Sequence, residues 1–188
     1  MTLTKNSKLY PGMSGTGIEF FTVEGEVKAL SNGQVKDFTQ LPFATIQLLD
    51  EAINEDYDAR LALLEWHPNS KYDRLQQFAS CRFGGLDFKA DIQNHILQKG
   101  EYLNCSVRAT CVFNGKICNK PMFKEVELTP ADVTLMQLTS TSLTNETIAE
   151  EMQLAFGTFH KLKKQLYAKL GVQTKQEVAL IANYLNII

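Results

Sequence analysis

The chain lacks a long hydrophobic run, a strong net charge and an apolar leader. None of its stretches approaches the ~20 consecutive apolar residues that a membrane-spanning helix needs. Its first residues contain no apolar core of the kind found in signal peptides. A formal net charge of −2 excludes a general polyanion-binding protein, because any nucleic-acid binding then requires a local basic patch. These absences predict a cytoplasmic protein that makes no contact with a membrane.

The motifs of several common enzyme classes are also missing. The sequence contains no glycine-rich phosphate loop, no Gly-x-Ser-x-Gly turn and no His-x-x-x-His pair. No cysteine stands beside residues that would mark it as a nucleophile. We therefore predict that the protein is not an enzyme.

Cysteines are few, and all of them fall in the middle of the chain, at Cys81, Cys105, Cys111 and Cys118. A cytosolic chain keeps its thiols reduced, which disfavours disulfides. Four thiolates suit a tetrahedral zinc site or an iron–sulfur cluster, although no Cys-x-x-Cys pair is present. Because few apolar residues between Cys105 and Cys118 are available to order that loop, we predict a zinc site. Free thiols in an irregular core are the close alternative, and an iron–sulfur cluster is the weaker one.

The first half of the chain has a strand pattern followed by three helix patterns. Two β-prone runs within residues 17–30 flank Glu24-Gly25 and predict a hairpin. Apolar periodicity then predicts helices over residues 41–53, 56–65 and 71–80, the last capped by Asn69.

The apolar periodicity weakens from Cys81 to Cys118. This segment opens with residues 81–87, which we predict to form a turn or loop. Within this segment we expect a helix over residues 91–98, with His95 on its surface. We therefore predict an α+β N-terminal domain over residues 1–124, with a sensing or interaction role and a Cys-containing segment over 81–118.

The remaining residues, 125–188, carry four helix signals in succession. Thr129-Pro130-Ala131-Asp132 starts the first, because a threonine cap, a proline and an acid suit a first helical turn. Thr144 caps the second helix, and Gly171 ends the third. A capping box over residues 174–177 begins the fourth. The fold class predicted for the whole chain is mainly α, with a four-helix C-terminal domain.

The third of these helices, residues 157–170, has one apolar side and one basic side. At 100° per residue, one stripe contains Phe159, Leu162, Leu166 and Leu170. The opposite side contains Gly157, His160, Lys161, Lys164 and Ala168, and Lys163 lies on the flank. Outward-facing lysines also occur on ordinary amphipathic helices, where they only face the solvent. The absence of acids from Ala155 to Leu170 favours a helix that enters a DNA major groove.

Residues 128–188 resemble the LuxR/GerE-type DNA-binding domain over its full length. The family's opening Leu-Thr-Pro and acid correspond to residues 128–132, and its Ser-Asn-x-x-Ile-Ala-x-x-Leu to residues 144–152. Its third-helix motif, which ends in Lys-Leu-Gly-Val, corresponds to residues 158–172. The chain departs from the family at Gln153 (usually glycine), Phe156 (commonly proline) and Leu162 (commonly histidine). These departures affect the expected base preference and leave the expected fold unchanged.

The resemblance implies a bacterial or phage transcription regulator that binds double-stranded DNA. By residue correspondence, His160, Lys161 and Lys164 face the major groove, and Thr158 and Lys163 contact phosphates. The fourth helix, residues 174–185, corresponds to the family's usual dimer face and implies a homodimer. A contact with RNA polymerase or with another regulator is a further expectation.

One alternative keeps the fold without DNA binding. Glu146, Glu150 and Glu151 crowd the second helix, so that residues 128–188 are close to neutral overall. An interaction module, such as an anti-activator or a phage adaptor, would tolerate that charge balance. A sigma-factor-like region shares the fold, but the other regions that a sigma factor needs are missing here.

Overall fold

The computed structural model describes residues 9–188, which form two compact units. The N-terminal unit comprises the described residues up to 103 together with 107–119, and the C-terminal unit comprises 104–106 and 120–188. Residue 124, where the sequence predicts a domain boundary, lies in a turn inside the C-terminal unit. Among the described residues, no helix has the length and apolar character needed to cross a membrane.

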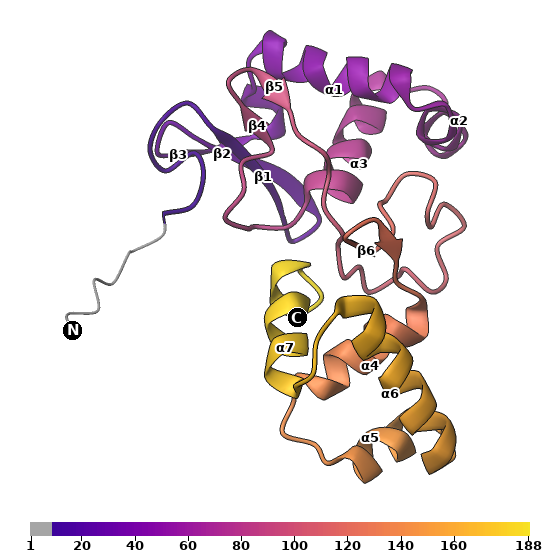
Figure 1. Ribbon diagram of the computed structural model, residues 1–188. Coiled ribbons are helices and arrows are strands. Elements are labelled where there is room, and N and C mark those ends of the chain that lie inside the picture. The colour runs from indigo at the N-terminus through magenta and orange to yellow at the C-terminus, as the bar shows by residue number, and fades with distance from the viewer. Residues whose placement is uncertain (1–8) are drawn as a thin grey trace, which may run out of the picture. The chain divides into compact units, whose positions relative to one another are not determined.

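The N-terminal unit is built on a sheet with the strand order β3-β2-β1-β4-β5 (Figure 1). Strands β1 (Ile18–Val23) and β2 (Glu26–Ser31) pair antiparallel, which confirms the predicted hairpin. Its turn, Glu24-Gly25, has positive φ at both residues (52° and 84°), as a two-residue hairpin turn requires. A second such turn, Asn32-Gly33, leads into β3 (Gln34–Asp37), a strand that the sequence analysis did not predict.

The helix predicted over residues 91–98 is wrong. Strands β4 (Ile92–Gln93) and β5 (Ile96–Leu97) form a short hairpin there, and Ile92 pairs with Ile18 of β1. Asn94 and His95 both have positive φ, 52° and 63°, so the chain reverses at these two residues. His95 is exposed at the tip of this turn.

The three predicted helices of this unit are present with shifted ends. They are α1 (Phe43–Glu55), α2 (Tyr57–Trp66) and α3 (Lys71–Phe83), and a short 3-10 helix, η1 (Phe38–Gln40), precedes them. The cap of α3 is Ser70 rather than Asn69, because the Asp73 amide donates to Ser70 Oγ at 3.1 Å. Since α3 continues through Cys81 to Phe83, the turn or loop expected over residues 81–87 begins only at Gly84.

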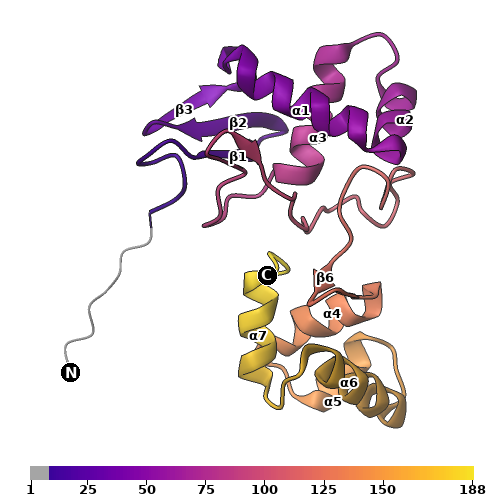
Figure 2. The ribbon, with the colours of Figure 1, turned by 45° about the horizontal axis from the view of Figure 1, so that its top comes forward.

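The core of the N-terminal unit lies between the sheet and the helices. Helix α3 packs against β1 and β2, and α1 packs against α3 and β5 (Figure 2). The largest fully buried side chains of this core are Phe20, Leu49, Leu63, Phe78 and Phe83. An α+β N-terminal fold is therefore confirmed.

Residues 107–119 form successive turns that are ordered by apolar contacts. Phe113 and Ile117 are buried in the core of the N-terminal unit, and the Phe113 ring stacks on Trp66 with centroids 4.7 Å apart. The expectation that few apolar residues are available to order this loop is wrong, because two of its side chains are buried in the core.

The C-terminal unit begins with a short hairpin, β6 (Met122–Phe123) and β7 (Val126–Glu127), and continues as helices (Figure 1). These helices are α4 (Pro130–Thr139), α5 (Asn145–Glu151), α6 (Phe156–Leu170) and α7 (Lys175–Tyr184). Helix α4 packs against α5, α6 and α7, and α5 packs against α6.

Threonine side chains begin three of these helices, as the sequence predicts. Thr129, Thr144 and Thr174 accept hydrogen bonds from backbone amides of α4, α5 and α7 at 3.1, 3.3 and 3.2 Å. Each satisfies an amide that has no partner within its own helix. Helix α6 has no such side-chain cap and no acid in its first turn.

Three carboxyl groups lie close together at β1 in the N-terminal unit. Glu19 and Glu101 accept backbone hydrogen bonds from Asp87 and Gly85 at 2.8 and 2.7 Å, and Asp91 accepts one from Phe20 at 2.7 Å. Burial is the main reason that the pKa of Glu19 and that of Glu101 rise to about 8 and that of Asp91 to about 10. Repulsion among these neighbouring carboxylates adds to the effect.

We predict that the N-terminal unit loses stability as the pH rises from about 4 to about 10, most steeply below about 8, where all three carboxyl groups contribute. The raised pKa values mean that the folded unit holds protons that the unfolded chain has released, so the stability is fully present below the unfolded pKa values and declines above them. The single tryptophan, Trp66, lies in this unit and reports its unfolding by denaturant.

Asp91→Asn removes one of the titrating groups and should flatten this pH dependence. Asp58→Asn, which changes an exposed carboxylate of the same unit, is the matched control. A free energy of unfolding that rises between pH 5 and pH 8 in the wild type would contradict the prediction.

Candidate nucleic-acid interface

Helices α5 and α6, with the turn between them, form the two-helix element of the candidate interface. Helix α5 ends with two backbone hydrogen bonds, from Gln153 to the Glu150 carbonyl and from Leu154 to the Ala149 carbonyl, both at 2.9 Å. This arrangement needs a left-handed residue after the helix, and Gln153 supplies it with φ of 54°. The chain therefore turns within four residues, 152–155, and starts α6.

One side of α6 is buried as its sequence predicts. Phe159, Leu166 and Leu170 are almost completely buried, and Leu162 is half-buried. Helix α6 begins at Phe156, one residue before the predicted start, and ends at the predicted Leu170. The buried stripe determines which side chains point away from the unit.

Lys161 and Lys164 lie on the opposite side of α6 and are exposed. Within residues 9–188, the side chain of neither lysine takes part in a hydrogen bond or an ion pair. These two cations are therefore available to an external anion.

Lys163 has a partner inside the unit. Its Nζ donates to Asn145 Oδ1 on α5 at 3.1 Å, and it lies over the Tyr167 ring at 5.3 Å from the centroid. This contact links the two helices of the element. Thr158, by contrast, is exposed in the first turn of α6.

Lys169 is bound to a buried acid at the start of α4. Its Nζ lies 2.5 Å from Asp132 Oδ2, and the Asp132 side chain is only 2% exposed. Burial raises the pKa of Asp132, but hydrogen bonds from Lys169 and from Thr129 outweigh that effect, so its pKa is lowered. The pair connects the last turn of α6 to the first turn of α4.

His160 stands in a small group of rings at the start of α6. Its ring lies edge-on to Phe156 at 4.3 Å between centroids and makes a second contact with Phe159 at 5.5 Å. His160 is exposed on its other side, next to the free lysines in sequence.

The four cysteines are not assembled into a metal site. Across residues 9–188, no three His, Cys, Asp or Glu side chains lie in a position to hold a metal ion. Cys81 accepts a hydrogen bond from Gln77 at 3.2 Å, Cys118 contacts Asn114 and Gly115, and Cys105 is exposed. As placed, these thiols do not fit a tetrahedral zinc site, and zinc stays a prediction from the sequence.

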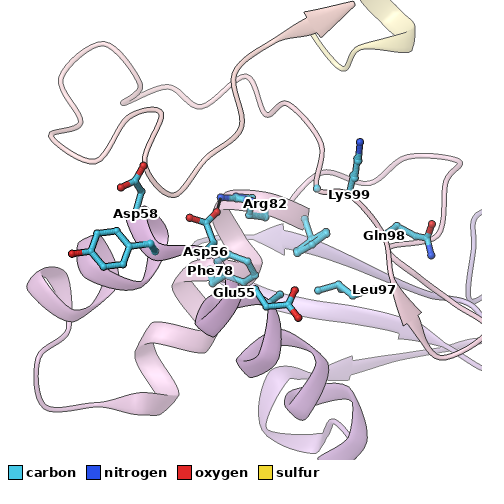
Figure 3. A pocket seen from close by; sticks show the side chains of 12 residues that line it. Glu55, Asp56, Asp58, Phe78, Arg82, Leu97, Gln98 and Lys99 are labelled. Atoms are coloured by element: carbon cyan, nitrogen blue, oxygen red, sulfur yellow. Dashed lines mark hydrogen bonds and ion pairs between the residues drawn. The ribbon is translucent and has the colours of Figure 1, made fainter. Parts of the chain in front are cut away.

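A pocket of about 600 Å³ lies in the N-terminal unit between the start of α2, the end of α3 and residues 97–100. Figure 3 shows that Asp56 and Arg82 point toward one another there, and they form an ion pair at 2.5 Å. Asp56 also accepts the Ala59 amide that begins α2, and Arg82 donates to the Ile117 carbonyl. Both charged groups thus hold the unit's own elements together, and the sequence analysis pointed to neither.

Comparison with known protein families agrees with the resemblance seen in the sequence. Residues 126–182 match the GerE model, described as bacterial regulatory proteins, luxR family. The match covers less than half of the chain and does not extend to the N-terminal unit. Neither the curated proteins nor the solved structures yield a match. Residues 126–182 are therefore a LuxR-family helix-turn-helix domain, which supports a DNA-binding transcription regulator in general; the family consists of regulators rather than enzymes.

The family positions can now be given structural roles. Asp132 and Lys169, which match the family's acid and its Lys-Leu-Gly motif, form the buried ion pair. Gln153 replaces a glycine at a position where the backbone is left-handed. In this chain the ion pair joins the two motifs, and the left-handed backbone at Gln153 shows that the turn forms even without glycine.

We predict that Lys169→Met lowers the free energy of unfolding of the C-terminal unit by about 2–3 kcal/mol, because it leaves a buried carboxylate without its cation. Adding Asp132→Asn should recover part of this loss, since the uncompensated charge is then gone. Denaturation followed by helical circular dichroism measures both values. Lys161→Met, at an exposed position of the same helix, is the control, and a Lys169→Met variant as stable as this control would refute the role of the pair.

Proposed function

We propose that this chain, whose residues 126–182 form a LuxR-family domain, is a transcription regulator that binds double-stranded DNA sequence-specifically. Helix α6 enters the major groove, with its buried stripe against the unit and its basic side toward the DNA. The observation that carries the proposal is the pair of exposed, unpartnered lysines, Lys161 and Lys164, on that side.

The side chains of α6 divide between base edges and phosphates. Lys161 and Lys164 bind phosphates or the acceptor atoms of guanine, and His160 reaches a base edge. Thr158 contacts a phosphate from the first turn. Lys163 contributes a phosphate contact from a position already fixed by Asn145, so it costs little side-chain entropy on binding.

Charge balance makes a single copy of this domain a weak DNA binder. Residues 128–188 contain five lysines and five acids, so the unit has no general attraction to DNA. Two copies on one DNA molecule would double the number of contacts. We propose that the second copy is held through residues 174–185, where Leu180 and Tyr184 are exposed one helical turn apart on α7.

The N-terminal unit supplies the sensing or interaction function in this proposal. Its core and its sheet are separate from those of the DNA-binding unit, as expected of an independent input domain. A contact with RNA polymerase or another regulator belongs to the same proposal.

We predict that Lys161→Ala combined with Lys164→Ala strongly weakens specific DNA binding, so that it is measurable only at low salt, while the helical circular dichroism spectrum stays unchanged. Both lysines are exposed and hold no other part of the unit, so their loss removes only external contacts. The measurement is a salt titration on a duplex obtained by random-duplex selection. The slope of log affinity against log salt should fall by about 2, one for each phosphate contact.

Lys99→Ala combined with Lys116→Ala removes the same charge from exposed positions of the N-terminal unit and is the matched control. Unchanged affinity and slope in the α6 double variant would overturn the role of these lysines. If no duplex binds the wild type even at low salt, the chain is instead an interaction module with a helix-turn-helix fold.

We predict that Leu180→Glu converts a dimer into a monomer, because it places a charge in the centre of the proposed apolar contact. A native mass spectrum measures the change, and the wild-type spectrum also shows whether zinc is bound. Leu86→Glu, at an exposed leucine of the N-terminal unit, is the control. A wild type that is monomeric at every concentration would contradict dimerisation through α7.

A further inference from the structure

The first residue of α6 is a large aromatic side chain that stays half-exposed. Phe156 is 45% exposed, although it stands beside the buried Phe159. Its ring is stacked near Phe159 at 6.1 Å and meets His160 edge-on at 4.3 Å. Two ring neighbours therefore hold one side of Phe156, while its other side faces away from the unit.

The second residue of α6 is a glycine that the unit itself does not need. Gly157 is exposed, its φ is not in the left-handed region, and a Cβ added there would meet no atom within 4 Å. Glycine inside a helix costs stability relative to alanine. In contrast, Gly171 has φ of 67°, a left-handed conformation that favours glycine at the end of α6. At Gly157 the cost has no compensation within the described part of the chain.

Gly157 lies on the same side of α6 as the free lysines. It precedes Lys161 by four residues and Lys164 by seven, so the three lie along one side of the helix. His160, which touches Phe156, borders that side. The bare backbone and the exposed ring therefore belong to the surface that the proposed function turns toward DNA.

We propose that Phe156 and Gly157 form an apolar reading contact, in which the bare Gly157 backbone lets α6 approach the bases and the Phe156 ring packs on a thymine methyl group. The C5 methyl of thymine is the one apolar group that a base presents in the major groove, and phenylalanine is among the side chains that contact it. Absence of a side chain at a helix position allows backbone to approach a ligand closely. The inference rests on the proposed function, because it assigns base preference to the same helix.

The methyl contact is tested by replacing thymines with deoxyuracil, one at a time, in a duplex selected by the full-length wild type. At one thymine per half-site the wild type should lose affinity about fourfold, the effect of exposing one methylene-sized group. Phe156→Ala should bind more weakly than the wild type and show no further loss at that thymine. Tyr57→Ala, an exposed aromatic of the N-terminal unit, should retain the full methyl effect.

The close approach is tested by Gly157→Ala, for which affinity and stability should change in opposite directions. The variant should raise the thermal midpoint of the helical signal by about 2 °C, because alanine is the better helix former. It should also weaken binding to the selected duplex about tenfold or more, because the added methyl holds base-edge contacts out of reach. Thr134→Ala, at an exposed position of α4, raises helix propensity without touching α6 and should leave affinity unchanged.

The outcomes separate this inference from the proposed function. If no duplex is selected, the proposed function fails, and the inference fails with it. If a duplex is selected but every deoxyuracil substitution affects wild type and Phe156→Ala equally, the methyl contact is wrong while DNA binding stands. A Gly157→Ala variant that binds as tightly as the wild type refutes the close approach in the same way.

Discussion

The geometry of the C-terminal unit depends on one buried carboxylate, that of Asp132. It accepts hydrogen bonds from the Thr129 amide and hydroxyl, both at 2.9 Å, and from Lys169 at 2.5 Å. The first two contacts fix the start of α4, and the third fixes the end of α6 against it. Any shift of α6 that separated Lys169 from Asp132 would leave a buried charge without its partner, which is costly. The pair therefore holds α6 in place against α4. The outward direction of Lys161 and Lys164 follows from that position.

The short turns of this unit follow helices that end in a residue with positive φ. Gln153, Gly171 and Asn186 each follow a helix with positive φ, and in each case the next amide bonds to a carbonyl five residues back. This closing motif satisfies carbonyls that have no partner within the helix. Glycine at 171 and asparagine at 186 are residue types that such a position favours, whereas glutamine at 153 is not. Gln153 is therefore the one member of the three with an unfavourable residue type for this backbone conformation.

Much of the fold was predictable wherever local chemistry decides it. Threonine caps, the Glu24-Gly25 turn and the apolar stripe of α6 depend on residues within about a turn of one another, and the structure confirms them. The Asn32-Gly33 turn, which was not predicted, has an equally local signal in its asparagine and glycine. A helix was predicted over residues 91–98 because the local pattern is ambiguous, whereas pairing of Ile92 with Ile18, far earlier in the chain, makes residues 92–97 a hairpin.

The family of residues 126–182, the order of their helices and the basic side of α6 could all be predicted from the sequence, because they depend on spacing along one segment. Which lysines are free depends instead on contacts that form in the folded unit. Lys163 binds Asn145, 18 residues away, and Lys169 binds Asp132, 37 residues away, so two of four cations are engaged inside the unit. The tertiary structure likewise showed that Phe113 and Ile117 order the loop for which a metal had been expected. Such contacts join residues that are far apart in the sequence, so the spacing of residues along the chain does not predict them.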